Sequence, residues 1–111
     1  MTPAEAFEEM RTGAALVDMR SETQRADDGL IPGAVFVARN VLEWRLDPAS
    51  EYRNHELARC ERRVILICHE GYQSSLAAAT VRRFGLDATD VIGGFLAWRD
   101  DRLPFEPGAA S

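Results

Sequence analysis

Short apolar runs alternate with amphipathic stretches along this chain. The clearest run is Val64-Ile65-Leu66-Ile67, whose continuous apolar character predicts a central strand buried on both faces of a parallel sheet. Residues 14–19, 34–38 and 88–92 are further strand candidates. Strands that alternate with helices indicate βαβ units. The pattern therefore predicts an α/β fold with a mostly parallel sheet and helices on both of its faces, in which residues 16–19, 64–67 and 91–92 lie in neighbouring inner strands.

Three stretches between and after these strands predict helices. The first helix is predicted over residues 3–12, because Thr2-Pro3-Ala4-Glu5 has the form of a capping box with proline at the first helical position. The alanine-rich residues 75–84 predict a strong helix that ends at Gly85. Residues 95–101 predict the last helix.

The remaining segments have weaker patterns. Residues 21–29 are polar and rich in Asp, so we expect a loop there. Residues 41–46 fit a short helix with Asn40 as its cap, and residues 56–60 fit one helical turn. Residues 103–111 contain two prolines and a glycine, which indicates a tail.

Length and charge bound the possible classes of protein. With 111 residues, the chain predicts one domain over residues 1–111, with its core at about 3–102. The net charge of −5 disfavours a general nucleic-acid binder. All 13 basic residues are Arg, which excludes Schiff-base chemistry on a lysine. No apolar run approaches the ~20 residues of a membrane span, and no secretory signal is visible. Two cysteines cannot form a disulfide scaffold, so a cytoplasmic setting is expected.

Cys68 is the strongest candidate for chemistry. It follows the best strand of the sequence and precedes the best helix, where ligands bind in open α/β sheets. A loop that curls into a helix directs backbone N–H groups and the positive helix pole toward its centre, which favours the thiolate of Cys68. Gly71 permits the tight turn, and Ser74 can cap the helix or donate to the sulfur. The same loop would hold a persulfide. The alternative is a buried cysteine that only packs.

Four segments together resemble the rhodanese-like sulfurtransferase family, in the family's own order. They span residues 16–98, nearly the whole chain. The segments are the strand motif Leu16-Val17-Asp18-Met19-Arg20, the turn Gly29-Leu30-Ile31-Pro32-Gly33-Ala34, the active loop Cys68-His69-Glu70-Gly71-Tyr72-Gln73-Ser74 and the signature Gly93-Gly94-Phe95-Leu96-Ala97-Trp98.

This resemblance implies a rhodanese-like three-layer domain and a nucleophilic cysteine. By the resemblance, Cys68 takes sulfane sulfur from a donor, becomes a persulfide and passes the sulfur to a thiol or other thiophilic acceptor. The donor is a small molecule or a persulfide-bearing protein. The backbone amides from His69 to Ser74 would form the anion-binding loop, with Glu70, Gly71, Tyr72 and Gln73 between them. Asp18 and Arg20 would support the loop. The family needs no metal or organic cofactor.

Three positions depart from the family pattern and affect the choice of donor. Leu30 replaces a usual His, Gln73 replaces a frequent Arg, and Glu70 adds a negative charge. The loop is therefore poorer in cations than one built to bind dianionic thiosulfate, and weak thiosulfate activity is expected.

Other candidate residues and functions remain beside this interpretation. We expect His69 on the rim of the pocket, because loop side chains point outward where the amides point inward. Cys60 is either an ordinary thiol or a resolving cysteine. His55 has no partner at metal-ligand spacing. A non-catalytic rhodanese-like binding or regulatory module is the alternative to an enzyme. A phosphatase or arsenate reductase loop would read Cys-x5-Arg, and Ser74 stands where that Arg belongs, which excludes this third class.

Overall fold

The computed structural model describes residues 1–59 and 61–107, which contain a four-stranded parallel sheet. Its strands lie in the order β2-β1-β3-β4, and all three pairings are parallel. The carboxyl ends of the strands therefore meet at one edge of the sheet. The expectation of a mostly parallel sheet is confirmed. The strands are β1 (Ala15–Asp18), β2 (Val35–Phe36), β3 (Val64–Ile67) and β4 (Ala88–Asp90).

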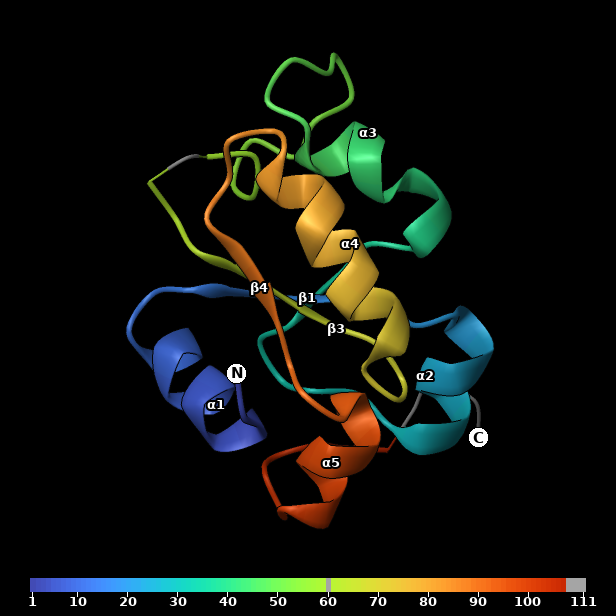
Figure 1. The fold of residues 1–111 in the computed structure, drawn as a ribbon. Helices are drawn as coiled ribbons and strands as arrows, with labels where there is room; N and C mark the ends of the chain where they lie inside the picture. Colours follow the sequence, from blue (N-terminus) through green and yellow to red (C-terminus); the bar gives the residue numbers. More distant parts are fainter. Residues whose placement is uncertain (60, 108–111) are drawn as a thin grey trace.

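Helices cover both faces of this sheet, as the sequence predicted (Figure 1). α3 and α4 pack on one face, and α1 and α5 pack on the other. A short 3-10 helix, η1 (Arg39–Val41), precedes α3. The α-helices are α1 (Pro3–Arg11), α2 (Glu22–Asp28), α3 (Leu42–Leu46), α4 (Tyr72–Arg82) and α5 (Gly94–Asp100).

The strand β3 has no polar face, because helices cover both faces of the sheet at this position. Successive side chains of a strand point to opposite sides of the sheet. Val64 and Leu66 pack beneath α3 and α4, whereas Ile65 and Ile67 pack against α1 and α5. All four side chains are fully buried. A continuous apolar run is therefore what this position in the sheet requires.

The prediction of a loop over residues 21–29 is wrong, because Glu22–Asp28 form the helix α2. Ser21 and Gln24 form a capping box in which each side chain bonds the other residue's backbone N–H. None of the helix residues is buried, so the hydrophobic pattern carried no helical period. Arg25 fixes the helix instead, with its guanidinium 4.0 Å from the ring centre of Phe36 in β2.

Three smaller expectations are also corrected. Asn40 is not the cap of α3, because it lies within η1, and Val41 occupies the cap position without a side-chain hydrogen bond. Residues 91–92 do not lie in an inner strand, because β4 ends at Asp90 and lies at the edge of the sheet. Residues 56–59 form turns rather than a helix, and Cys60 lies outside the described residues.

The segment expected to be a tail is fastened to the body at residues 103–107. Leu30 and Glu106 form an antiparallel bridge, with hydrogen bonds of 2.7 and 2.8 Å between their backbones. The indole N–H of Trp98 donates to the carbonyl oxygen of Pro104 at 2.8 Å. Phe105 packs edge-on against Phe95 of α5. These contacts close one end of the core beside the turn that contains Leu30.

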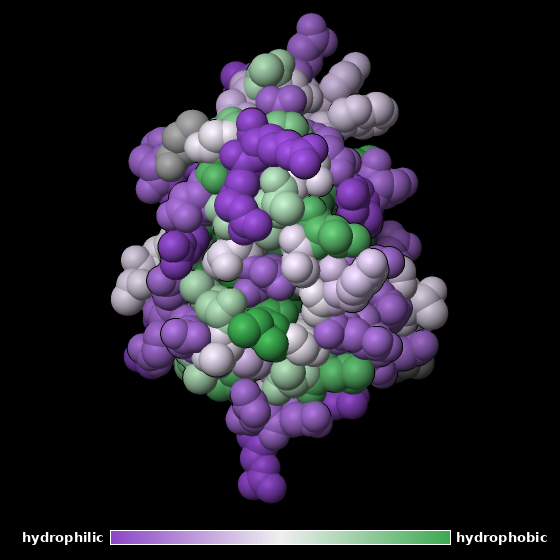
Figure 2. Space-filling model, in the orientation of Figure 1, coloured by the Kyte–Doolittle hydropathy of each residue, from purple (hydrophilic) through white to green (hydrophobic). Residues whose placement is uncertain are grey.

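Among the described residues, several large apolar side chains are exposed, and two of them, Trp44 and Tyr52, pack with their ring centres 5.9 Å apart. Figure 2 shows apolar residues as separate green patches among purple polar residues on one face. No helix in the described part of the chain is long and apolar enough to cross a membrane.

Two leucines test this assignment of core and surface. Leu66 is fully buried in β3, whereas Leu76 on α4 is 55% exposed. We expect Leu66→Ala to lower the free energy of unfolding by about 2–5 kcal/mol, because it removes buried methyl groups and leaves a cavity. Leu76→Ala should cost less than about 0.5 kcal/mol, since it lies on the surface. Urea unfolding of both variants measures the difference, and similar losses would contradict the packing described above.

Candidate active site

Cys68 lies at the carboxyl edge of the sheet, directly after β3 and four residues before α4 begins. Its side chain is only 4% exposed. Beside it, the N–H of Met19 donates to the carbonyl oxygen of Ile67 and continues the β1–β3 pairing to the start of the loop. The sulfur is thus placed by the two central strands of the sheet.

Backbone N–H groups surround the sulfur of Cys68. The N–H of Gly71 lies 3.1 Å from Sγ and that of Ser74 lies 3.3 Å from it, and both donate to the sulfur. The Cys68 thiol in turn donates to Oγ of Ser74 at 3.2 Å. When the sulfur is an anion, the Ser74 hydroxyl can turn and donate instead. The loop therefore offers two amide donors and one hydroxyl to a negative charge at this point.

The N-terminus of α5 holds the outer side of the same loop. The carbonyl oxygen of Cys68 accepts from the N–H of Phe95 at 2.8 Å, and that of His69 accepts from Leu96 at 3.2 Å. In a trans peptide the C=O and the following N–H point in opposite directions. Because these two carbonyls point toward α5, the N–H groups of His69 and Glu70 point away from it, into the loop.

Glycines allow this close approach between α5 and the loop. A Cβ atom on Gly94 would lie 2.5 Å from the carbonyl oxygen of Cys68 and 2.6 Å from that of His69. A Cβ atom on Gly71 would lie 2.8 Å from the backbone nitrogen of Gly93. Gly71 also has a φ of +98°, which side chains disfavour. Gly71 of the Cys68 loop and the Gly93-Gly94 pair at the start of α5 thus form the two sides of one backbone contact.

Asp18 and Arg20 form a buried ion pair beside the loop. Nη2 of Arg20 donates to Oδ2 of Asp18 at 2.7 Å, and Nε donates to Oδ1 at 3.0 Å. Nη2 also donates to the carbonyl oxygen of Gly29 at 2.8 Å, and the guanidinium stacks on Phe95 at 4.1 Å. The pair therefore joins the end of β1 to the turn after α2 and to the helix that holds the loop.

A pocket of about 270 Å³ opens over Cys68. Its lining combines the loop with one residue of α2 that the sequence did not single out, Gln24. The polar pattern of this segment predicts a loop, and the sequence signal for a helix there is the capping-box spacing of Ser21 and Gln24. The other lining residues are Cys68, His69, Glu70, Tyr72 and Gln73, and none of them is Arg or Lys.

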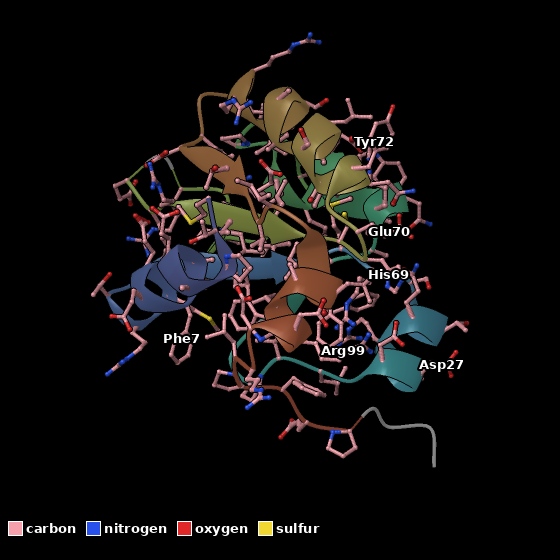
Figure 3. All side chains as sticks on the ribbon, turned by 60° about the horizontal axis from the view of Figure 1, so that its bottom comes forward. Phe7, Asp27, His69, Glu70, Tyr72 and Arg99 are labelled. Atoms are coloured by element: carbon pink, nitrogen blue, oxygen red, sulfur yellow. The ribbon has the colours of Figure 1, made fainter. Side chains whose placement is uncertain are left out.

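The side chain of Ser74 bonds the sulfur, whereas His69 lies at the rim of the pocket. Nδ1 of His69 lies 3.3 Å from Oδ2 of Asp28 in α2. Figure 3 shows His69 turned toward α2, with Glu70 and Tyr72 following along the loop. Glu70, Tyr72 and Gln73 are exposed. Among the described residues, no three metal-ligating side chains cluster.

The contact between Gly94 and the loop generates a stability test with a matched control. Gly85 also has a positive φ, of +86°, but a Cβ atom there would meet nothing within 4 Å. Gly85→Ala should therefore cost only the backbone strain, about 1–2 kcal/mol. Gly94→Ala should cost about 2 kcal/mol more, because its methyl group also displaces the carbonyls of the Cys68 loop.

Chemical denaturation measures the free energy of unfolding of each variant. The rate at which Cys68 is alkylated, followed by peptide mass spectrometry, reports on the conformation of the loop. We expect an altered alkylation rate in Gly94→Ala and an unchanged rate in Gly85→Ala. Equal effects of the two substitutions would show that α5 does not hold the loop.

Solved structures share this architecture. A protein of unknown function from Rhodopseudomonas palustris, described as a possible tyrosine phosphatase, is 34% identical, with 95% of this chain and 82% of that chain covered and a TM-score of 0.85. A rhodanese-related protein from Thermoplasma volcanium is 19% identical, with 95% and 94% covered and a TM-score of 0.76. A thiosulfate sulfurtransferase from Pseudomonas aeruginosa is 25% identical, with 97% and 19% covered and a TM-score of 0.76.

The sequence comparisons agree with the fold. Among curated proteins, no relative matches the chain. The family model of the rhodanese-like domain matches residues 2–101, which include the Cys68 loop, the Asp18–Arg20 pair and all the strands and helices described above. The chain belongs to the rhodanese-like domain family.

Proposed function

We propose that the protein is a sulfurtransferase that carries sulfane sulfur as a persulfide on Cys68. The observation that carries this proposal is the pair of amide donors from Gly71 and Ser74 on a buried sulfur at the end of a strand. Such a site stabilises a thiolate, which is the nucleophilic form of cysteine. The family to which the chain belongs and the similarity to the Pseudomonas aeruginosa thiosulfate sulfurtransferase support the same reaction.

The reaction has two transfers that balance in atoms and charge. In the first, the Cys68 thiolate attacks the outer sulfur of a donor such as thiosulfate. The new S–S bond takes the place of the donor's S–S bond, and sulfite leaves with the electron pair. In the second, an acceptor thiolate attacks the outer sulfur of the Cys68 persulfide, and the Cys68 thiolate is the leaving group. Both the resting and the loaded enzyme carry one negative charge in the loop.

The surrounding residues divide between binding and positioning in this proposal. The inward amides from His69 to Ser74 stabilise the negative charge, and Tyr72 forms part of the pocket wall. Asp18 and Arg20 are positioning residues, because their contacts reach the loop through Phe95 of α5. Small sulfur donors or persulfide-bearing proteins, and thiol acceptors, are the partners this chemistry implies.

The structural similarity to a possible tyrosine phosphatase raises a second candidate activity. Phosphate binding in such a loop needs an Arg six residues after the cysteine. Ser74 stands at that position here, and its hydroxyl and N–H both bond Cys68. No arginine is among the residues that line the Cys68 pocket in the described chain. The site therefore favours sulfur transfer. A non-catalytic binding module remains the outcome if Cys68 carries no sulfur.

Loading of Cys68 is the direct test of this proposal. Incubation with a sulfur donor should add one sulfur atom, about 32 Da, to the peptide that contains Cys68 and restore a thiol after an acceptor is added. Cys68→Ser should abolish both the adduct and turnover while keeping the fold, since the two side chains are similar in size. Mass spectrometry and steady-state kinetics measure the two effects.

Cys60→Ser is the control for this experiment. We expect it to keep the adduct and most of the turnover, because the amide donors of the loop bond the sulfur of Cys68. A large loss in Cys60→Ser would indicate a relay between two cysteines. Sulfur transfer by Cys68→Ser at the rate of the unaltered protein would refute the assignment of the nucleophile.

The charges at the pocket predict which donors react well. Glu70 and Gln73 line the pocket over Cys68, so a dianionic donor meets a negative and a neutral side chain there. A cation in place of Gln73, at ~6 Å and an effective dielectric near 20, would add about 3 kcal/mol of gross attraction. Solvent screening reduces this to about 1 kcal/mol, or several-fold in affinity. Thiosulfate turnover should therefore be weak.

Substitutions at Glu70 and Gln73 test whether charge or loop geometry determines the reaction with thiosulfate. We expect Gln73→Arg and Glu70→Gln each to lower KM for thiosulfate several-fold, with less change in kcat. Less highly charged donors, such as organic or protein persulfides, should respond less. Steady-state kinetics with both donor classes measures this, and equal responses of the two classes would overturn the electrostatic explanation in favour of loop geometry.

A further inference from the structure

Gln24 reaches the pocket over Cys68 from a different element than the other residues of its lining. It lies in the first turn of α2 and is half-buried, whereas the other lining residues belong to the Cys68 loop and the first turn of α4. A ligand in this pocket therefore lies between the loop and Gln24. The chemical groups that Gln24 offers to the ligand depend on how its side chain is oriented.

A hydrogen bond fixes the orientation of the Gln24 carboxamide. Its Oε1 accepts from the backbone N–H of Ser21 at 3.1 Å, and Oγ of Ser21 accepts from the N–H of Gln24 at 3.1 Å. Because the Ser21 N–H is a donor, it must face the oxygen of the carboxamide rather than its nitrogen. The polar group that remains is the NH2, which has two N–H donors and bonds no other residue in the described part of the chain.

Polar contacts hold α2 beside the loop, since the helix buries no residue. At one point, the guanidinium of Arg25 lies 4.0 Å from the ring centre of Phe36 in β2. At another, Oδ2 of Asp28 lies 3.3 Å from Nδ1 of His69 in the loop, and Figure 3 shows His69 turned toward α2. These contacts attach α2 both to the sheet and to the Cys68 loop, and so keep Gln24 at the pocket.

The capping box alone does not require glutamine at this position. Glutamate forms the same box, as Glu5 does with Thr2 at the start of α1. A negative charge in the first turn also suits the N-terminus of a helix. Glutamine differs from glutamate in its NH2 group and its lack of charge. Neither difference serves the cap, whereas both change what a ligand meets in the pocket.

We propose that Gln24 is a binding residue whose NH2 group donates to an oxygen atom of the sulfur donor. It thereby favours donors that carry oxygen on the sulfur that leaves. Thiosulfate is of this kind, because its oxygens lie on the sulfur that departs as sulfite with the electron pair of the broken S–S bond. An organic persulfide has no oxygen on its leaving sulfur. The role of Gln24 in donor choice rests on the proposed function, whereas the presence of its N–H donors at the pocket does not.

Two substitutions of Gln24 separate the pocket donor from the cap. Gln24→Glu keeps the capping box, removes the NH2 group and adds a negative charge. Gln24→Met removes the NH2 group without adding a charge. Thr23→Glu is the control, because it adds the same charge one residue earlier, on an exposed residue outside the lining of the Cys68 pocket.

Steady-state kinetics give the first measurement. Gln24→Met should raise KM for thiosulfate about three- to fivefold, because a hydrogen bond to a charged oxygen is lost. A larger rise is expected in Gln24→Glu, whose carboxylate also repels the donor. KM for an organic persulfide should respond little to Gln24→Met, and Thr23→Glu should leave KM for thiosulfate unchanged. Urea unfolding should show that Gln24→Glu keeps the stability of the unaltered protein.

Alkylation of Cys68 gives a second measurement that needs no sulfur transfer. In iodoacetate a carboxylate is bonded to the carbon that the thiolate attacks, whereas iodoacetamide carries an uncharged amide there. The ratio of the two rates, from peptide mass spectrometry, should fall about three- to fivefold in Gln24→Met, because N–H bonds to charged oxygens are the stronger ones. It should stay unchanged in Thr23→Glu. A change in loop structure or in the amount of thiolate alters both rates alike and leaves the ratio as it was.

The proposal is overturned if Gln24→Met leaves the ratio of alkylation rates unchanged, or if Gln24→Glu leaves KM for thiosulfate unchanged. These outcomes are distinct from failure of the proposed function. A lowered ratio in Gln24→Met without a sulfur adduct on Cys68 would contradict the sulfurtransferase and keep the N–H donor at the pocket. An adduct together with an unchanged ratio would keep the sulfurtransferase and reject the role of Gln24.

Discussion

The hydrogen bonds between α5 and the Cys68 loop are the constraint on which the site depends. Without them, the carbonyl groups of Cys68 and His69 would be free to rotate toward the sulfur, where they would oppose a negative charge. The N–H groups of Phe95 and Leu96 bind these carbonyl oxygens from the outer side of the loop. The N–H groups of His69 and Glu70, which follow these carbonyls in the chain, are therefore held pointing into the loop. A second element thus orients the dipoles of the loop before any ligand arrives, so little reorganisation is needed when charge develops.

The buried Asp18–Arg20 pair connects this contact to the rest of the sheet. A buried ion pair is costly to desolvate, and its net contribution to stability is small unless its remaining donors are satisfied. Here Arg20 also bonds the Gly29 carbonyl and stacks on Phe95, but its Nη1 is buried without a hydrogen-bond partner. The Asp18–Arg20 pair mainly fixes positions, because the Arg20 guanidinium contacts the end of β1, the turn after α2 and the helix that orients the loop. Nε of Arg25 also lies 3.5 Å from Oδ2 of Asp18, so two guanidinium groups face this one carboxylate.

The sequence predicted the parts of this structure that depend on continuous burial. The run in β3 specified a central strand, and with it the position of Cys68, because burial on both faces leaves no polar position. α2 was missed because it buries no residue, and Gln24 was missed as a pocket residue for the same reason. The bonds from α5 to the loop join residues about 27 positions apart. Local patterns do not report such a contact, although Gly93 and Gly94 marked its place.

A site made of amide dipoles distinguishes between anions by charge and by position. The amides of Gly71 and Ser74 act at the sulfur of Cys68 itself. In the proposed reaction, a persulfide would place the negative charge one S–S bond, about 2 Å, beyond the sulfur of Cys68. The charge would then lie farther from these two amides, in the pocket that Glu70 and Gln73 line. In the proposed sulfurtransferase, the loop backbone would mainly govern the resting thiolate, whereas the side chains of the rim would also act on the loaded sulfur and the incoming donor. Under this proposal, sequence changes at the rim would alter the choice of donor while the nucleophile stays the same.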